Sequence, residues 1–288
     1  MQVILMVNSE CNAKCKHCYL SYTGSRNPED ALDAVKRLQA NGHSVIIAGS
    51  ETLLNPDYLK AYQQAGQKYL LTNGILLDRD ESLYGLLKQH GIEKLTFSIH
   101  FGIQNDLRSV PESLVARVLQ ESKKRGFQTQ ITTTITSSNY SHINEMCKKS
   151  VEYVVNTIQF NRLVQIERSS EMESMVLTIE QINDFFKQIV EARKKYHKSI
   201  LEIKINGNFG PRPGSKGESL AIQNNYCPAG RKLTAIDPQN KVYGCPFSMH
   251  PECVIGKYEN GQIIIDKELI NGNRNTCIAH LLVANNPN

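Results

Sequence analysis

The sequence has no apolar run long enough to cross a membrane, and its first residues, MQVILMVNSEC, contain neither a basic segment nor a cleavage site. These absences argue against a membrane-spanning helix and against a secretory signal peptide. Eight cysteines in a chain without such a signal favour metal binding or redox chemistry over disulfide bonds. We therefore expect a cytoplasmic protein with no membrane partner.

The sequence also has no block of charge of one sign. Its formal net charge of +5 results from 33 Lys and Arg against 28 Asp and Glu, which are spread along the chain. This distribution is typical of a solvated surface, so we expect no nucleic-acid partner. The 288 residues, 40% of them apolar, suffice for one large domain with a small appendage.

Short β-branched runs alternate with longer segments of helical period, which predicts βα units and a parallel sheet. The predicted strands are residues 3–7, 44–48, 69–72, 94–99, 128–135 and 157–164. The predicted helices are residues 28–40, 56–65, 81–89, 112–125, 142–153 and 178–197. This pattern defines a first domain, 1–205, and stops at a Gly- and Pro-rich linker, 206–225. The last domain, 226–288, contains two predicted hairpins, with turns at 238–240 and 259–261.

Three cysteines follow the first predicted strand with the spacing C-x3-C-x2-C: Cys11, Cys15 and Cys18. Three thiolates hold three irons of a [4Fe-4S] cube and leave the fourth iron open to a substrate or cofactor. The alternative is a structural zinc site, which four ligands close and for which His17 is a potential fourth ligand.

One set of residues resembles the signature of the radical SAM superfamily: Cys11, Cys15, Cys18 and, just before the last cysteine, His17. The resemblance implies that S-adenosylmethionine chelates the open iron and that one electron breaks a C–S bond, which gives a 5′-deoxyadenosyl radical. It implies an α/β fold, a partial (β/α)6 TIM-like barrel with a small C-terminal β-hairpin-rich Fe–S domain of the Twitch type. It also places His17 and Tyr19 beside the cofactor.

Further motifs of that family stand at successive strand ends. Gly49-Ser50-Glu51 resembles the GGE motif, which contacts the methionyl amino group, with Ser50 in place of the second glycine. Thr72-Asn73-Gly74 resembles the family's TNG. Ser98 and His100 stand where the family often has S-x-D near the ribose, and His100 departs from the acid. The resemblance implies that these residues bind the cofactor, while a substrate-facing His100 is the alternative.

Four more cysteines lie beyond the linker: Cys227, Cys245, Cys253 and Cys277. A predicted hairpin separates the first two, and Asn240 stands where the SPASM/Twitch extension has a glycine. The resemblance implies one auxiliary [4Fe-4S] cluster on these four cysteines, because that number suits a single closed cube. A zinc ribbon is the competing interpretation. If one of these cysteines is free, His280 is the expected replacement.

In relatives, an auxiliary cluster accepts the electron of a substrate radical, either in ribosomal peptides (crosslinks, thioethers, epimers) or in small-metabolite alcohols. The first predicted strand begins at residue 3, which leaves no room for a peptide-recognition domain, whereas the loop at 206–219 suits a peptide. We prefer the peptide over the small-molecule alcohol, with a flavodoxin- or ferredoxin-type electron donor. A non-catalytic Fe–S or zinc protein is the remaining alternative.

Two residues are candidate catalytic groups. Cys147 lies in a helix-like segment and is either a small buried hydrophobe or a thiol that returns a hydrogen atom to a substrate radical. Arg162 follows the core of the sixth strand, and Glu167-Arg168 lies just beyond it, where a carboxylate clamp or a base is useful. Ordinary surface pairing is the alternative for these charged residues.

Overall fold

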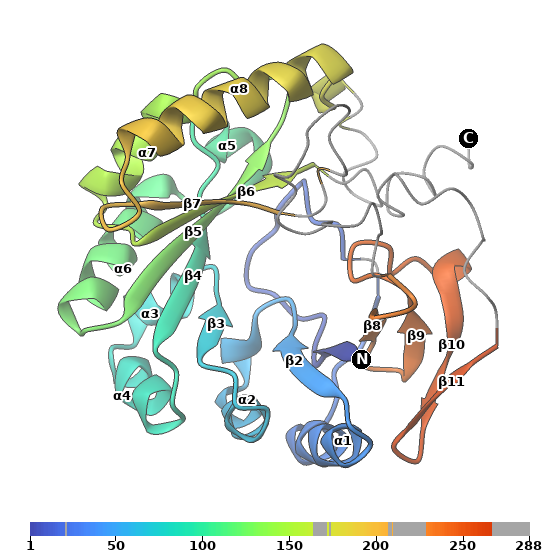
Figure 1. Ribbon diagram of the computed structural model, residues 1–288. Helices are drawn as coiled ribbons and strands as arrows, with labels where there is room; N and C mark the ends of the chain where they lie inside the picture. The colour runs from blue at the N-terminus through green and yellow to red at the C-terminus, as the bar shows by residue number, and fades with distance from the viewer. Residues whose placement is uncertain (21, 164–171, 173, 207–208, 210–228, 267–288) are drawn as a thin grey trace. The chain divides into compact units, whose positions relative to one another are not determined.

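The computed structural model describes residues 1–20, 22–163, 172, 174–206, 209 and 229–266. The chain divides into two compact units, each with its own β-sheet (Figure 1). The first unit comprises Met1–Asn12, Tyr19–Lys68 and Gly210–Asn288, and the second comprises Ala13–Cys18 and Tyr69–Phe209. Within the described ranges no helix is both long and apolar enough to cross a membrane.

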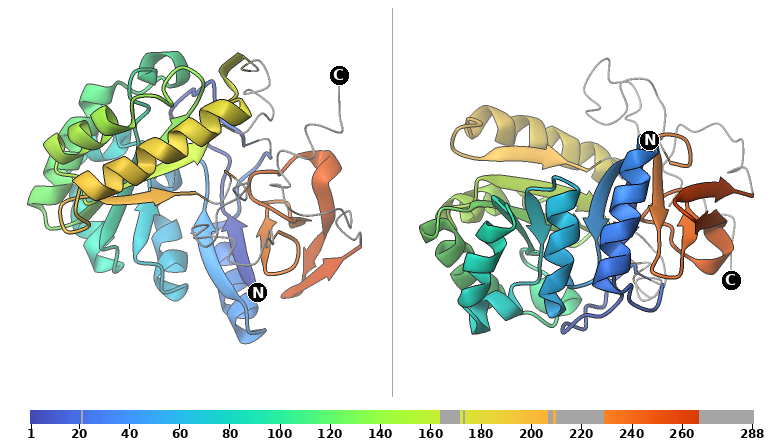
Figure 2. Two further views of the ribbon diagram at one scale, coloured as in Figure 1. Left: turned by 45° about the horizontal axis from the view of Figure 1, so that its top comes forward. Right: turned by 90° about the horizontal axis from the view of Figure 1, so that it is seen from below.

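The first unit contains a six-stranded sheet with the order β11-β10-β9-β8-β1-β2 (Figure 2). Its strands are β1 (Gln2–Met6), β2 (Ser44–Ala48), β8 (Leu233–Ile236), β9 (Lys241–Tyr243), β10 (Val254–Glu259) and β11 (Gln262–Ile265). β1 is parallel to both β2 and β8, while β8 to β11 form an antiparallel meander. The last strands of the described chain therefore extend the sheet that the first strand begins.

Both predicted hairpins are confirmed, and the residues in their turns explain them. Asn240 has a φ of 66° between β8 and β9, and Asn260 and Gly261 have φ values of 50° and 85° between β10 and β11. Asparagine and glycine are the residues that adopt left-handed conformations most readily. The domain limits 1–205, 206–225 and 226–288 stay a prediction, since much of the last two segments lies outside the described residues.

The helices of the first unit follow their sequence signals. α1 (Pro28–Ala40) begins after Asn27, whose side chain accepts a hydrogen bond from the N–H of Glu29. Pro28 at the first helical position suits this start. α1 buries one face on the unit, formed by Ala31, Ala34, Val35 and Leu38. The segment after β2 contains two 3₁₀ turns, Thr52–Leu54 and Pro56–Tyr58, and then α2 (Leu59–Gln64).

The second unit contains a five-stranded parallel sheet whose strands follow one another in chain order. They are β3 (Tyr69–Leu71), β4 (Lys94–Ser98), β5 (Gln128–Ile135), β6 (Thr157–Arg162) and β7 (Glu202–Ile205). The helices between them are α3 (Ile75–Arg79), α4 (Ser82–Gln89), α5 (Gln104–Leu107), α6 (Glu112–Lys124), α7 (Ile143–Glu152) and α8 (Ile179–Lys195). Each predicted strand and helix is thus present, most of them within one or two residues of the expected limits.

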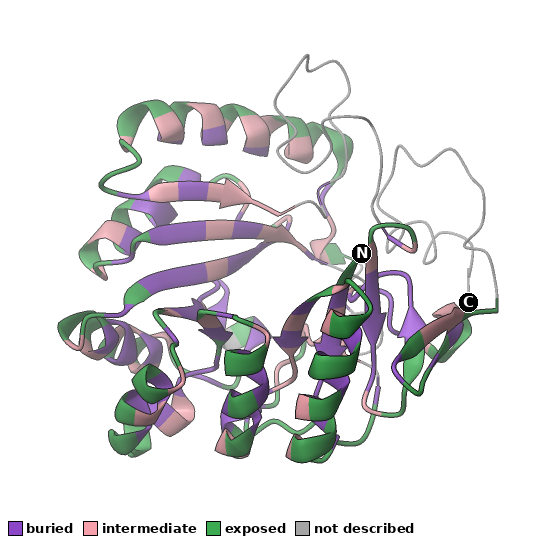
Figure 3. Ribbon diagram, turned by 60° about the horizontal axis from the view of Figure 1, so that its bottom comes forward, coloured by how far each residue is buried: buried purple, intermediate pink, exposed green. Residues whose placement is uncertain are grey.

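Side chains alternate between two faces of this second sheet, and the two faces differ in polarity. The apolar face packs on the helices: the ring of Phe160 in β6 lies 5.8 Å from that of Phe185 in α8. Figure 3 shows the buried residues gathered on the strands and on the inner sides of the helices. The opposite face, called here the polar face, is built largely from Ser98, Gln130, Thr132, Thr134, Gln159 and Asn161.

Three short elements of the second unit were not predicted: α3, α5 and β7. β7 has the sequence EIKI, which alternates polar and apolar residues over only four positions. Such a run is too short for periodicity to identify. It is a strand because it pairs with β6, in the register Thr157 to Glu202.

Candidate cofactor and cluster site

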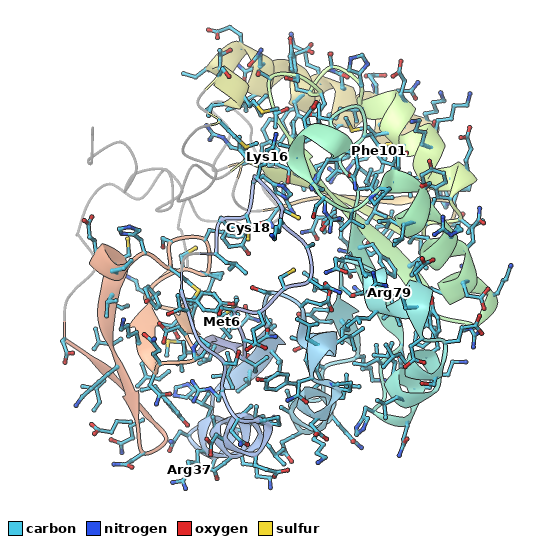
Figure 4. All side chains as sticks on the ribbon, turned by 180° about the vertical axis from the view of Figure 1, so that it is seen from behind. Met6, Lys16, Cys18, Arg37, Arg79 and Phe101 are labelled. Atoms are coloured by element: carbon cyan, nitrogen blue, oxygen red, sulfur yellow. The ribbon has the colours of Figure 1, made fainter. Side chains whose placement is uncertain are left out.

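The loop with the predicted cluster ligands is held in the second unit by the connection between β4 and α6. The N–H of Lys14 donates to Ser109 Oγ at 2.7 Å, and the N–H of Lys16 donates to the carbonyl of Leu107 at 2.9 Å. Within the loop, the N–H of Cys18 donates to the carbonyl of Cys15 at 3.3 Å. Figure 4 labels Lys16 and Cys18 on this loop. Backbone bonds therefore fix the path of the chain between these two cysteines.

His17 lies between those cysteines and is neutral. Its Nδ1–H donates to the carbonyl of Leu107 at 3.1 Å, because a carbonyl oxygen can only accept. Burial lowers the pKa of His17 to about 4; the nearby positive charge of Arg108 contributes to this shift, and the bond to Leu107 opposes it. Nε2 is therefore an unprotonated acceptor at neutral pH.

His100 is buried beside His17, and the two ring centroids lie 4.5 Å apart in an edge-to-face arrangement. The N–H of Thr134 donates to His100 Nδ1 at 2.9 Å, which places the proton of the neutral ring on Nε2. Burial holds the pKa of His100 well below its usual value. Nε2 has no hydrogen-bond partner among the described residues, so the site contains one buried donor suited to a ligand oxygen.

Arg108 is a residue of this site that the sequence analysis missed. The residue is 9% exposed, and its guanidinium donates to the carbonyl of Ser98. No carboxylate pairs with it in the described part of the chain. A buried cation without a counter-ion is costly, so this position suits an anionic group of a ligand. Arg108 stands at no strand end and in no motif, and its sequence context therefore contained no signal.

In the first unit, Gly49-Ser50-Glu51 is fastened to the segment after β1 by another residue that was not predicted, Asn8. The side chain of Asn8 donates to the carbonyl of Glu51 at 3.0 Å and accepts from the N–H of Ser50 at 3.2 Å. The N–H of Glu51 donates to the carbonyl of Glu10, next to Cys11, at 3.0 Å. Glu51 itself is fully buried. The expected acceptor for the methionyl amino group is thus tied to the first cluster cysteine by the backbone.

The close approach of Asn8 explains the glycine at position 49 and gives a prediction. A Cβ built on Gly49 collides with Asn8 Oδ1. We expect Gly49→Ala to destabilise the protein by about 1–3 kcal/mol, because the held amide cannot move aside. The matched control is Gly85→Ala in α4, where a Cβ meets nothing within 4 Å. This control should stabilise by about 0.5–1 kcal/mol, since alanine favours a helix interior. Thermal unfolding of both variants measures the difference, and equal shifts would contradict the packing argument.

The TNG segment forms the turn between β3 and α3. Thr72 Oγ1 accepts from the N–H of Gly74 at 3.1 Å, and Asn73 Oδ1 accepts from the N–H of Ile75 at 2.9 Å. Gly74 has a φ of 87°, which favours glycine. These bonds account for the local shape of the motif, and a contact of Thr72 or Asn73 with the cofactor stays a prediction.

The C-terminal cysteines are only partly within the described residues. Cys245 is 7% exposed, and Cys253 packs against a buried cluster formed by Met6, Tyr22, Ala235, Tyr243 and Met249. Tyr19, expected near the cofactor, lies against Phe247 with ring centroids 5.2 Å apart. Cys227, Cys277 and His280 lie outside the described residues. The structure therefore describes two of the four predicted auxiliary ligands, both in the first unit.

The two candidate catalytic residues both lie toward the helices of the second unit. Cys147 is fully buried in α7, and burial raises the pKa of its thiol to about 12. This placement favours the role of a small buried hydrophobe, and hydrogen donation stays a prediction. In β6, Arg162 alternates with Asn161 and shares the side of Ile158 and Phe160, which is the apolar face. Glu167-Arg168 lies outside the described residues.

Six described cysteines form no disulfide bond with another described residue: Cys11, Cys15, Cys18, Cys147, Cys245 and Cys253. Across the described ranges, no three His, Cys, Asp or Glu side chains are arranged to hold a metal ion. Cys11 belongs to the first unit, whereas Cys15 and Cys18 belong to the second. The donor set still suits an iron–sulfur cluster, because the three thiols are exposed or half-buried and stand on one short loop.

The family model of the radical SAM superfamily matches residues 6–150. Mycofactocin maturase MftC of Mycobacterium tuberculosis (strain CDC 1551 / Oshkosh) is 25% identical over 264 residues, which cover 85% of this chain. The chain spans 64% of the length of that relative.

Solved structures also resemble the chain, SuiB and anSMEcpe among them. Streptococcus suis SuiB bound to precursor peptide SuiA matches with a TM-score of 0.68 and 15% identity, over 85% of this chain and 59% of that one. Native anSMEcpe with bound AdoMet matches with a TM-score of 0.66 and 21% identity, over 96% of this chain and 82% of that one. These matches confirm the predicted fold, a partial barrel with a strand-rich C-terminal part.

Proposed function

Because the chain belongs to the radical SAM superfamily, we propose that it cleaves S-adenosylmethionine to modify a ribosomally made peptide. The observation that carries the cofactor part is the anchored loop of Cys15 and Cys18. That loop is bonded to the connection that also bears Arg108, and His17 on it packs on His100. Cluster ligands and polar groups for a cofactor thus belong to one structural element.

Cys11, Cys15 and Cys18 hold the [4Fe-4S] cluster in this proposal. When bound, the cluster and S-adenosylmethionine together supply one-electron cleavage of a C–S bond and thereby a radical able to abstract hydrogen from carbon. The buried carboxylate of Glu51 accepts from the methionyl ammonium, and Ser98 with His100 Nε2 serves the ribose oxygens. Neutral His17 lies against the nucleoside without adding charge to the site.

Arg108 binds the carboxylate of S-adenosylmethionine. Arg108 is a buried residue that follows Leu107, on which His17 is anchored, and its guanidinium has no carboxylate partner among the described residues. A bond between two charged groups in such a place contributes about 1.5–3 kcal/mol. The carboxylate of S-adenosylmethionine would therefore offset the free-energy cost of burying the Arg108 cation without a counter-ion.

We expect Arg108→Met to weaken S-adenosylmethionine binding at least about tenfold, which corresponds to ~1.4 kcal/mol. Calorimetric titration of the anaerobically reconstituted protein measures this affinity. The matched control is Arg117→Met, because Arg117 is 61% exposed and pairs with Asp78 on the surface. Iron content should be the same in both variants. Equal affinity in the two would remove Arg108 from the cofactor site.

The peptide part of the proposal is supported by similarity to MftC and by the fold shared with SuiB. Cys227, Cys245, Cys253 and Cys277 would hold an auxiliary [4Fe-4S] cluster, which would supply an acceptor for the electron that hydrogen abstraction leaves on the substrate. The burial of Cys245 and the apolar packing around Cys253 suit a site closed to water. A crosslink or thioether is the outcome for which such an electron acceptor is needed.

An external donor of the flavodoxin or ferredoxin type supplies the first electron, and the cytoplasm is the proposed compartment. No disulfide bond joins the described cysteines, which suits a reducing environment.

The test is co-expression with the short peptides encoded near the gene, followed by mass spectrometry of each peptide. A crosslink or thioether removes a pair of hydrogens from the peptide, and epimerisation in heavy water introduces one deuterium. Formation of 5′-deoxyadenosine is measured on the purified protein in parallel. Deoxyadenosine that increases with a small alcohol and with no peptide would replace this substrate class by the alternative.

A further inference from the structure

A chain of hydrogen-bonded amide side chains crosses the polar face of the second unit's sheet. Lys94 Nζ donates to Gln130 Oε1 at 3.3 Å, and Gln130 Nε2 donates to Gln159 Oε1 at 3.3 Å. Gln159 Nε2 then donates to Asn161 Oδ1 at 3.2 Å. We call this series, from Lys94 to Asn161, the amide relay. It runs from β4 through β5 to β6.

The lysine at its start determines which way each amide of the relay points. A charged lysine only donates, so the oxygen of Gln130 must face Lys94 and its NH₂ must face Gln159. Each following amide is constrained in the same way, because two facing oxygens or two facing NH₂ groups do not form a hydrogen bond. The orientation of Asn161 is thus fixed by a charge two strands away.

At the end of the relay, Asn161 is left with an outward donor. Its Oδ1 accepts from Gln159 and also from Asn206 Nδ2 at 3.0 Å, which uses both lone pairs. Its Nδ2 has no partner among the described residues, and the side chain is partly exposed. Asn161 therefore presents two N–H groups and no acceptor.

The position of Asn161 suits substrate better than cofactor. Asn161 pairs with Thr134, the residue whose N–H holds the ring of His100. Gln159 and Ser98 both pair with Thr132, so they stand two strands apart, about 10 Å. A group bonded to Ser98 does not reach the β6 side chains directly. An extended peptide covers that distance with about three residues.

Building on the proposed function, we propose that Asn161 donates to a backbone carbonyl of the peptide substrate, and that the amide relay holds it in this orientation. Asn161 is then a specificity-determining residue, and Lys94, Gln130 and Gln159 are positioning residues. The arrangement selects a hydrogen-bond acceptor and disfavours a second donor at this place. A peptide backbone meets the requirement whatever the neighbouring side chain is.

The decisive variant is Asn161→Asp, because it removes the outward donor, adds a negative charge and keeps the acceptor that the relay uses. The carboxylate oxygen still accepts from Gln159 and Asn206, while the outward NH₂ is replaced by an oxygen. The probe is a displayed library of random peptides, selected on the reconstituted holoenzyme with S-adenosylmethionine bound. Peptides captured by the wild type should bind Asn161→Asp at least about tenfold more weakly, ~1.4 kcal/mol.

Lys94 tests the relay itself. Lys94→Met removes the group that sets the amide orientation, and we expect peptide affinity to fall about threefold. Lys94→Arg keeps a donor and should restore it, which a merely structural role would not require. Lys124→Met is the matched control, since the Lys124 side chain is 75% exposed on α6 and pairs with Glu121, outside the relay. Its peptide affinity should equal that of the wild type.

Several results would overturn the inference. One is equal peptide affinity of the wild type and Asn161→Asp, and another is capture of no peptide by the wild type. A parallel loss of S-adenosylmethionine affinity in Asn161→Asp would move the residue to the cofactor site. Failure of the proposed function would look different, as a wild-type protein that forms no 5′-deoxyadenosine although its peptide binding still depends on Asn161.

Discussion

Cys18→Ser should lose reductive cleavage of S-adenosylmethionine, with 5′-deoxyadenosine formation reduced more than about 100-fold. Serine keeps the size of the side chain, but its hydroxyl stays protonated and binds iron poorly compared with a thiolate. The loop itself should persist, because it is held by the backbone bonds of Lys14 and Lys16 rather than by the thiol. Anaerobic reconstitution followed by chromatography of deoxyadenosine measures the effect.

The matched control for this variant is Cys147→Ala. Cys147 is buried in α7, far from the cysteine loop in sequence. The Cys147→Ala variant should form deoxyadenosine as the wild type does, but its thermal stability should be lower. The pair separates ligand loss from general damage. A Cys18→Ser protein that cleaves the cofactor at the wild-type rate would refute the ligand assignment.

The second large effect is expected at the C-terminal cysteines, where Cys245→Ala should uncouple cofactor cleavage from product formation. The variant keeps Cys11, Cys15 and Cys18, so deoxyadenosine should still form. Product should fall sharply, because the electron left on the peptide then has no acceptor and the radical is quenched. The ratio of deoxyadenosine to modified peptide is the readout.

Iron analysis accompanies this measurement. Two cubes bind about eight irons and one cube about four, so Cys245→Ala should contain about half the iron of the parent. Cys147→Ala, again the control, should contain the full amount. A parent protein with about four irons and one zinc would show that these cysteines form a structural cap, and the electron-accepting role would be withdrawn.

Local signals in the sequence predicted much of this fold. The strands Ser44–Ala48 and Gln128–Ile135 have the predicted limits, because their runs rich in β-branched residues are bounded by turn residues. The helix Pro28–Ala40 also has the predicted limits, because its capping residue, its first proline and its apolar period all indicate the same helix. Asn240, in the predicted turn at 238–240, has a φ of 66°, a left-handed conformation that asparagine tolerates.

Features that depend on distant pairs were not predictable in this way. Asn8 acts through Glu51, 43 residues away, and Lys14 bonds to Ser109 across 95 residues. Arg108 is notable only because of what surrounds it after folding. The orientation of Asn161 depends on the register of three strands, which no single segment encodes. Spacing identified the candidate ligands, whereas the polar contacts around them required the fold.

The order of strands in the first unit bears on how the chain is made. β1 pairs with β2, which is synthesised soon after it, but its other neighbour is β8, in the register Gln2 to Leu233. At about 5–20 residues per second, the ribosome needs roughly 10–50 s to reach that partner. During this time one edge of β1 is an unpaired template beside the cysteine loop. We therefore expect this edge of the emerging chain to be open to pairing with other strands until β8 is made.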